Sequence, residues 1–171
     1  LAYHSRDQHL SGDSKKEAIS RGIPISKAMM DETLLAYKMN QEDIPLIHGQ
    51  PLRLVVGGWP ASASGKWLAQ LSIRNIVHDG AKMGGQAYRI PCETVAPGTP
   101  VSDKDMCIIE SMPVKSLLTY PKSGALLENQ KNLEIRGHAW AGELAVSAVY
   151  YSIDFGATWD VCHLSAPINR L

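Results

Sequence analysis

Residues 48–68, HGQPLRLVVGGWPASASGKWL, combine a short apolar segment with residues suited to binding an anion. Leu52, Leu54, Val55 and Val56 predict a buried strand, because four apolar residues within five positions favour an extended interior segment. The Gly-Gly-Trp-Pro sequence that follows contains turn residues and is expected to end this strand sharply.

A loop of small residues, 61–65, follows the predicted strand and would let a ligand approach the backbone closely. His48, Arg53 and Lys66 flank this loop and supply cationic or hydrogen-bond-donating side chains. The combination predicts a bound phosphate or pyrophosphate. It is not a P-loop, because Lys66 is followed by Trp67 where that motif requires Ser or Thr.

The composition is that of an ordinary globular protein of 171 residues, with 44% hydrophobic and 20% charged residues. Its 17 basic and 17 acidic residues give a formal net charge of zero, so general attraction to nucleic acid is not expected and anion binding must be local. No apolar run approaches the roughly 20 residues of a membrane-spanning helix.

The three cysteines, Cys92, Cys107 and Cys162, have no CxxC spacing, and the sequence predicts no metal site. Two interpretations of them stay open. All three could be small buried apolar residues, or Cys92 and Cys107 could pair in an oxidising compartment.

Residues 1–112 show mixed local signals. Residues 1–18 are polar with little periodicity, so they predict either a loop or structure completed by chain that is absent here, and they would not form a core alone. Ser26 is a candidate N-cap for a short helix. Residues 34–39 predict an apolar strand, residues 71–73 continue an alternating strand, and the Gly- and Pro-rich residues 78–100 predict a long loop over a ligand.

Residues 113–171 contain short alternating apolar runs separated by Gly, Asn, Pro and Asp, as in a β-sandwich. Trp140 and Trp159 are expected to fill its core. An immunoglobulin-like sandwich takes around 100 residues, so we expect missing chain or a partner to complete this one.

Several segments together resemble the sulfite oxidase and sulfite dehydrogenase family of molybdopterin enzymes, most closely the bacterial periplasmic sulfite dehydrogenases. The segments are LLAYKMN (34–40), HGQPLRLVVGGWPASASGKWL (48–68), YRIPCETVAPGT (88–99), ESMPVKSLLTYPKSGALL (110–127) and LEIRGHAWAGELAVSAVYYSIDFGATWDVCHL (133–164), with HSRDQHLSGD (4–13). The resemblance implies a strand-rich α+β chain. Residues 1–112 would be the later part of the molybdopterin-binding domain, and residues 113–171 part of an immunoglobulin-like dimerisation domain.

The resemblance also implies site residues. His48, Arg53 and Lys66 match positions that contact the phosphate and pterin of molybdopterin, and Ser64 and Gly65 match adjoining backbone contacts. For Arg53 and Lys66, the alternative from residue type alone is an exposed pair of charges at a strand end.

Two departures from the family pattern concern the metal and the substrate. The family's molybdenum-ligating cysteine lies in an upstream Cys-Ala-Gly-Asn context that none of the three cysteines here matches. Ile19, in AISRGIP, takes the approximate place of the active-site tyrosine, so that role is vacant or falls to another residue such as Tyr3. Arg21 could attract sulfite as a catalytic-site cation, the alternative being a solvated loop arginine.

The implied function is part of a periplasmic enzyme that oxidises sulfite to sulfate with molybdenum–molybdopterin and passes electrons to a c-type cytochrome. A homo-oligomer is expected through the second domain. Two alternatives stay open: a related molybdopterin enzyme acting on a sulfane or sulfoxide, and a non-catalytic β-sandwich binding module.

Overall fold

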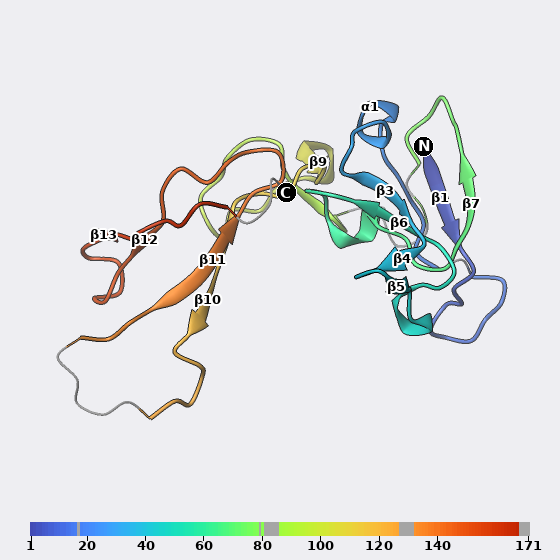
Figure 1. Ribbon diagram of the computed structural model, residues 1–171. Helices are drawn as coiled ribbons and strands as arrows, with labels where there is room; N and C mark the ends of the chain where they lie inside the picture. The colour runs from blue at the N-terminus through green and yellow to red at the C-terminus, as the bar shows by residue number, and fades with distance from the viewer. Residues whose placement is uncertain (17, 79, 81–85, 127–131, 168–171) are drawn as a thin grey trace. The chain divides into compact units, whose positions relative to one another are not determined.

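The computed structural model describes residues 1–16, 18–78, 80, 86–126 and 132–167, and it divides into two compact units, Leu1–Glu110 and Ser111–Leu171. Strands dominate both units (Figure 1), so the prediction of a strand-rich α+β chain is confirmed. Within the described residues no helix is long and apolar enough to cross a membrane.

The first unit is built from short strands and single helical turns. They are β1 (Ala2–Ser5), β2 (Arg21–Gly22), α1 (Ile25–Ala28), β3 (Thr33–Ala36), β4 (Lys38–Met39), β5 (Glu42–Asp43), η1 (Leu46–His48), β6 (Arg53–Val56), η2 (Ala61–Ala63), β7 (Leu68–Ser72), β8 (Arg89–Pro91), η3 (Asp103–Asp105) and β9 (Met106–Ile108). Antiparallel pairing joins β1 to β2 and β7, β3 to β6, β4 to β5, and β8 to β9.

Of the two interpretations of residues 1–18, the loop is wrong, because β1 lies within them and carries part of the core. Ala2 is 1% exposed and Tyr3 is 3% exposed. Strand β1 pairs antiparallel with β2 and with β7, and its partners in β7 lie more than 60 residues away along the chain. A polar segment with two buried residues shows no local periodicity, and only this long-range pairing reveals the strand.

The core of the first unit gathers around Tyr3. Its buried members are Tyr3, Ile23, Leu54, Val56, Trp59 and Ala63. The strand predicted from residue 52 begins at Arg53, and it buries Leu54 and Val56 while Leu52 and Val55 are half-buried. Among the described residues β6 pairs with β3 in a two-stranded sheet, and its burial alternates, so one of its faces packs on the core.

Other local expectations for the first unit need correction. Helix α1 begins at Ile25 after Pro24, without a side-chain cap, so Ser26 lies inside the helix and is not its N-cap. Residues 34–39 divide between β3 and β4 at Tyr37. Strand β7 ends at Ser72, which leaves Ile73 81% exposed.

Residues 78–100 are not one continuous loop, because β8 lies within them and pairs with β9. A disulfide joins Cys92 to Cys107 across this hairpin, so the alternative in which both are buried free thiols is wrong. The hairpin is therefore closed covalently at one end. Residues 79 and 81–85 of the predicted loop lie outside the described residues.

Lys27 is buried in α1 and ties that helix to the turn before β3. Its side chain is 3% exposed, and its Nζ donates to Glu32 Oε1 at 2.7 Å. The Glu32 carbonyl accepts from the Gly57 N–H at 3.2 Å, which links this turn to the end of β6. The Lys27–Glu32 pair thus supports the strand that carries Arg53.

Replacing Glu32 with glutamine should lower the melting temperature, because it leaves the buried Lys27 ammonium without its carboxylate. The hydrogen bond from Lys27 lowers the pKa of Glu32 below its ordinary 4.5. A lowered pKa means that the stabilisation is present above pH 4.5 and fades as the pH falls through the lowered value. Melting temperatures of wild type and Glu32→Gln, measured from pH 7 to pH 3, should come closer together as the pH falls. A difference in melting temperature that stays constant over this range would show that the Lys27–Glu32 pair does not stabilise the fold.

The second unit contains β10 (Lys115–Tyr120), β11 (Arg136–Trp140), β12 (Tyr150–Tyr151) and β13 (Asp160–Val161), paired antiparallel as β10–β11 and β12–β13. Trp140 is 38% exposed and Trp159 is 62% exposed, so the prediction that they fill a core is wrong. Both lie on or beside two-stranded sheets, and among the described residues no second layer covers them.

The SIDFGATW segment forms a hydrogen-bonded turn between β12 and β13. Asp154 accepts from the Thr158 N–H at 2.9 Å, from Thr158 Oγ1 at 2.7 Å and from Ser152 Oγ at 2.8 Å. These donors, Thr158 first, lower the pKa of Asp154 to about 2. Residues 152–159, part of a segment that resembles the family, therefore form a structural turn in this unit.

Candidate functional site

The cationic residues predicted from the sequence converge on one helical turn, η1. Its three carbonyls each accept a side-chain hydrogen bond: Leu46 O from Trp67 Nε1 at 2.8 Å, Ile47 O from Lys66 Nζ at 3.0 Å, and His48 O from Arg53 Nη1 at 3.1 Å. Leu46 O also accepts from the Gly49 N–H at 3.1 Å, which caps the turn. The last carbonyls of a helical turn, here Ile47 O and His48 O, have no backbone partner within it, so they attract cations and N–H donors. This turn therefore brings His48, Arg53 and Lys66 together.

Close backbone packing holds Lys66 against the end of η1. Gly49 adopts φ 110°, and a Cβ atom there would lie 2.9 Å from Cβ of Lys66. The Leu68 N–H donates to Leu52 O at 2.8 Å, and the Leu54 N–H donates to Gly65 O at 2.8 Å. The segment before β6 and the segment before β7 are thus held side by side.

Arg53 and Lys66 keep donors available for a ligand. Arg53 Nε is buried and has no hydrogen-bond partner among the described residues. Guanidinium carries five N–H donors and ammonium three, and among the described residues each side chain donates one hydrogen bond to a carbonyl of η1. A buried unsatisfied donor is costly unless a ligand completes it, so Arg53 fits an anionic group at this place. The alternative of an exposed strand-end pair does not describe the half-buried Arg53.

His48 and Ser64 have backbone groups that are already hydrogen-bonded within the protein. His48 is exposed, and its backbone takes part in the turn through its N–H to Pro45 O and its carbonyl to Arg53. The Ser64 N–H donates to Ala61 O at 3.0 Å, and its Oγ accepts from the Val56 N–H at 3.0 Å. The donor that Ser64 has left for a ligand is therefore its hydroxyl proton and not its backbone N–H.

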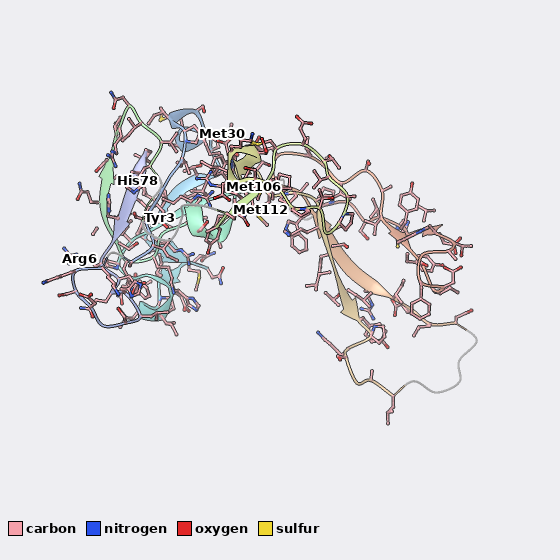
Figure 2. All side chains as sticks on the ribbon, turned by 180° about the vertical axis from the view of Figure 1, so that it is seen from behind. Tyr3, Arg6, Met30, His78, Met106 and Met112 are labelled. Carbon is pink, nitrogen blue, oxygen red and sulfur yellow. A yellow bond between two sulfur atoms is a disulfide. The ribbon has the colours of Figure 1, made fainter. Side chains whose placement is uncertain are left out.

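Gly65 lies directly against the ring of Tyr3, which is inside the first unit (Figure 2). A Cβ atom at this position would stand 2.5 Å from Cε2 and 2.6 Å from Cδ2 of that ring. Gly65 is thus required by packing, whatever it contributes to a ligand.

Gly65→Ala should therefore cost about 1–3 kcal/mol of folding free energy, because an added methyl overpacks this contact. Chemical denaturation of the purified protein measures the loss. In a Tyr3→Leu background, where the ring is gone, the same substitution should cost much less. Equal costs in both backgrounds would show that the Tyr3 ring is not what excludes the methyl group.

Arg21 is not a solvated loop arginine, because β2 places it in the interior at 2% exposure. Its Nη1 donates to Ser62 Oγ at 2.6 Å and its Nη2 donates to Ile109 O at 3.0 Å. Its guanidinium carbon lies 5.6 Å from the centroid of the Tyr88 ring. Arg21 therefore stands behind Ser62 and lines neither of the pockets described below.

Tyr3 lies opposite Arg21 in the β1–β2 pair and donates from its hydroxyl to Ser62 O at 2.6 Å. Burial raises the pKa of Tyr3 to about 12; the charge of Arg21 lowers that pKa, and Tyr88 raises it. The hydroxyl stays protonated at neutral pH and remains a donor. Ser62 thus has contacts with two buried side chains, a role its sequence position among small residues did not reveal.

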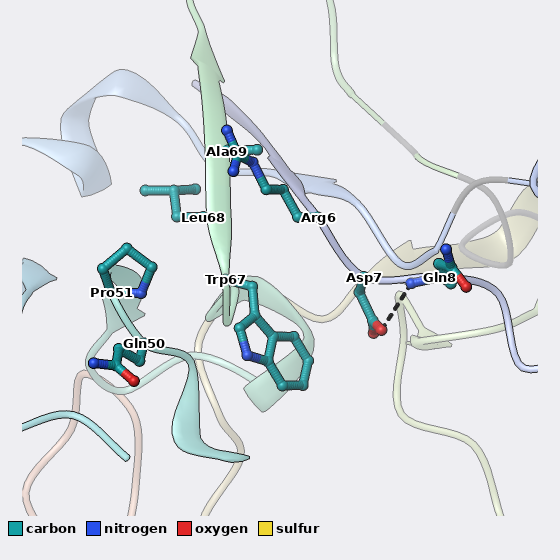
Figure 3. A pocket seen from close by; sticks show the side chains of 8 residues that line it. All are labelled: Arg6, Asp7, Gln8, Gln50, Pro51, Trp67, Leu68 and Ala69. Atoms are coloured by element: carbon teal, nitrogen blue, oxygen red, sulfur yellow. Dashed lines mark hydrogen bonds between the residues drawn. The ribbon is translucent and has the colours of Figure 1, made fainter. Parts of the chain in front are cut away.

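Two pockets adjoin this cluster, and Asp7 and Trp67 line both. The larger, of about 620 Å³, includes Arg6, Gln50 and Trp67 in its wall. Figure 3 shows the Trp67 indole between the side chains of Gln50 and Asp7. The smaller, of about 150 Å³, is lined by Tyr3, Ser5, Asp7, Ile19, Ala61, Ser62, Ser64, Gly65, Lys66 and Trp67.

Comparison with known proteins gives the family. Residues 1–82 match the oxidoreductase molybdopterin binding domain, and residues 106–170 match the Mo-co oxidoreductase dimerisation domain. The chain belongs to the sulfite oxidase family. This family assignment confirms the resemblance seen in the sequence.

Among the sulfite oxidase relatives, the mitochondrial enzyme of Homo sapiens is 33% identical over 94% of this chain. Sulfite oxidase of Gallus gallus is 30% identical over 94% of this chain. The sulfane dehydrogenase SoxCD of Paracoccus pantotrophus superposes with a TM-score of 0.70 at 26% identity, covering 97% of this chain and 39% of that chain. The chain spans 30% of the human protein and 36% of the chicken protein.

Membership of the sulfite oxidase family confirms molybdenum–molybdopterin as the cofactor. The chemistry of this chain fits the phosphate end of that cofactor, because Arg53 Nε is a buried donor without a partner and Lys66 Nζ is held next to the same turn. In the described part of the chain no group of three or more His, Cys, Asp or Glu residues could hold a metal ion.

Proposed function

We propose that this chain is part of an enzyme that oxidises sulfite to sulfate. The supporting observation is the similarity to sulfite oxidases over 94% of its length, together with a donor set suited to their cofactor. The overall reaction takes one sulfite and one water to one sulfate, two protons and two electrons. A c-type cytochrome that accepts one electron at a time would take the two electrons in succession.

The residues around η1 hold the cofactor in this proposal. Arg53 binds the phosphate through its guanidinium fork and Lys66 binds it as a point charge, while His48, Ser64 and Gly65 complete the contacts. The bound molybdenum group supplies the two-electron chemistry. Anchoring the anionic end of a rigid cofactor places its other end, so this chain contributes orientation.

Arg21 contributes positive charge to the substrate side of the site in this proposal. It is buried behind Ser62, so its charge is weakly screened and acts on an anion in the small pocket without direct contact. This replaces direct attraction of sulfite by a solvent-facing arginine.

A sulfane substrate is the second candidate, favoured by the likeness to the sulfane dehydrogenase SoxCD. Steady-state turnover of the holoenzyme with cytochrome c as acceptor distinguishes the two. Sulfite should be oxidised at a kcat/KM well above that for a sulfane, and no turnover is expected with a sulfoxide. Turnover of a sulfane but not of sulfite would refute the preferred substrate.

Periplasmic location and self-association are further parts of the proposal. The Cys92–Cys107 disulfide supports an oxidising compartment. The match of residues 106–170 to a dimerisation domain supports a homo-oligomer. Cell fractionation and analytical ultracentrifugation test these two points; a cytoplasmic monomer would contradict both.

A further inference from the structure

Ser62 is fixed from two sides by buried groups on neighbouring strands. Its carbonyl accepts from the Tyr3 hydroxyl and its Oγ accepts from Arg21 Nη1, each at 2.6 Å. Tyr3 and Arg21 are 3% and 2% exposed and Ser62 is half-buried, so both donors are held in the interior while Ser62 itself still reaches the pocket. A small loop residue held this firmly has a defined hydroxyl position.

The direction of the hydrogen bond leaves the Ser62 proton available. A guanidinium group can only donate, so Ser62 Oγ is the acceptor in its bond with Arg21. Across the ranges that the structure describes, Ser62 Oγ donates to no protein group. A hydroxyl that accepts from a cation is also polarised into a stronger donor.

The small pocket supplies a place for the group that receives this proton. Ser62 lines its wall together with Ser64 and Lys66, and its volume of about 150 Å³ exceeds the roughly 30 Å³ share of one water. Lys66 and the nearby Arg21 bring two positive charges against the single carboxylate of Asp7. The net positive charge beside the pocket favours binding of a small oxyanion.

We propose that the Ser62 hydroxyl directly binds an oxyanion in this pocket and that Arg21 is its positioning residue. The inference rests on the proposed function for the identity of the ligand. Two sources share the chemistry, the phosphate of the cofactor and the sulfur oxyanion that is substrate or product. In either case, Ser62 gives a directional hydrogen bond, which the flexible Lys66 ammonium does not.

Purified holoenzyme carrying Ser62→Ala tests the site, with Ser62→Thr as the matched control that keeps the hydroxyl. Inorganic sulfate is the probe, its dissociation constant measured by calorimetry, and molybdenum per subunit reports retention of the cofactor. Loss of a hydrogen bond to a charged group should weaken the affected ligand about tenfold or more. Ser62→Thr should stay within about threefold of wild type. Ser62→Cys, of similar size but a weak donor, replaces Ser62→Ala if the latter does not fold.

Arg21→Lys probes the positioning residue, because it keeps the charge but loses the guanidinium fork. We expect the affected ligand to weaken by less than in Ser62→Ala, and the double variant to be no weaker than Ser62→Ala alone. Additive losses in the double variant would show that Arg21 does not act through Ser62.

The outcomes separate the two sources. If Ser62→Ala binds sulfate more weakly but keeps its molybdenum, the ligand of Ser62 is the sulfur oxyanion. If Ser62→Ala loses molybdenum, while the molecules that keep it bind sulfate as wild type does, the ligand is the phosphate of the cofactor. The inference is overturned if folded Ser62→Ala has the sulfate affinity and the molybdenum content of wild type. It is also overturned if Ser62→Thr shows the same loss as Ser62→Ala. Wild-type protein without molybdopterin would instead refute the proposed function, and its sulfate affinity would still decide the role of Ser62.

Discussion

Replacing Arg53 and Lys66 together with alanine should abolish retention of molybdopterin. Each side chain offers charge-assisted hydrogen bonds to a phosphate, worth about 1.5–3 kcal/mol apiece. The double variant should therefore bind the cofactor about two orders of magnitude more weakly, or worse. Molybdenum analysis and fluorescence of the released pterin, both per subunit of the purified enzyme, measure the effect.

Single variants measure how much Arg53 and Lys66 each contribute to cofactor binding. Arg53→Lys keeps a charge but loses the fork and the buried Nε donor, so it should fall between wild type and Arg53→Ala. The matched control is Lys38→Ala/Lys104→Ala, which removes two exposed positive charges from the same unit. Near wild-type molybdenum in a folded Arg53→Ala/Lys66→Ala protein would show that the phosphate binds elsewhere.

Removing the Cys92–Cys107 disulfide should cost about 3 kcal/mol at 25 °C. The two cysteines are 15 residues apart, and a cross-link of this length restricts the unfolded chain by about that free energy. Denaturant unfolding of Cys92→Ser/Cys107→Ser against wild type measures it. Cys162→Ser is the control, because Cys162 is a free cysteine and its loss should change stability little.

The same variant should also weaken anion binding through the hairpin that carries the disulfide. Tyr88 and Ile109 lie at the other end of β8–β9, where the Ile109 N–H donates to Tyr88 O at 3.1 Å. Both contact Arg21, one through its ring and one through its carbonyl. Unchanged stability and sulfate affinity without the disulfide would show that the β8–β9 pairing alone holds these contacts.

Much of the structure of residues 48–68 was predictable because its signals are local. The apolar run before Gly57 predicted β6, and Arg53 and Lys66 lie close to it along the chain. The strand start, however, was placed one residue early, and Ser64 was expected to use a backbone N–H that the loop itself satisfies. Local sequence reports residue chemistry well and hydrogen-bond partners poorly.

In the second unit, the packing was predicted less well than the local structure. Residues 133–164, which include Asp154, contributed to the family resemblance, and the structure forms a turn at Asp154. The expected burial of Trp140 and Trp159 does not occur among the described residues. Hydrophobic residues can be recognised from sequence alone, but their burial depends on a facing layer. Nothing within the two-stranded pairs β10–β11 and β12–β13 provides that layer.

The sequence by itself determined the strand-rich class, the family and the cations that suit an anionic cofactor, because each depends on residue types within short segments. The tertiary structure alone decided the burial of Tyr3 and Arg21, the Cys92–Cys107 pairing and the place of Ser62 between two buried donors. Those contacts join positions 59, 41 and 15 residues apart, for Tyr3–Ser62, Arg21–Ser62 and the disulfide respectively. No local pattern encodes which distant segments meet, because that is set by how β1, β2 and the loop after β6 pack around one core.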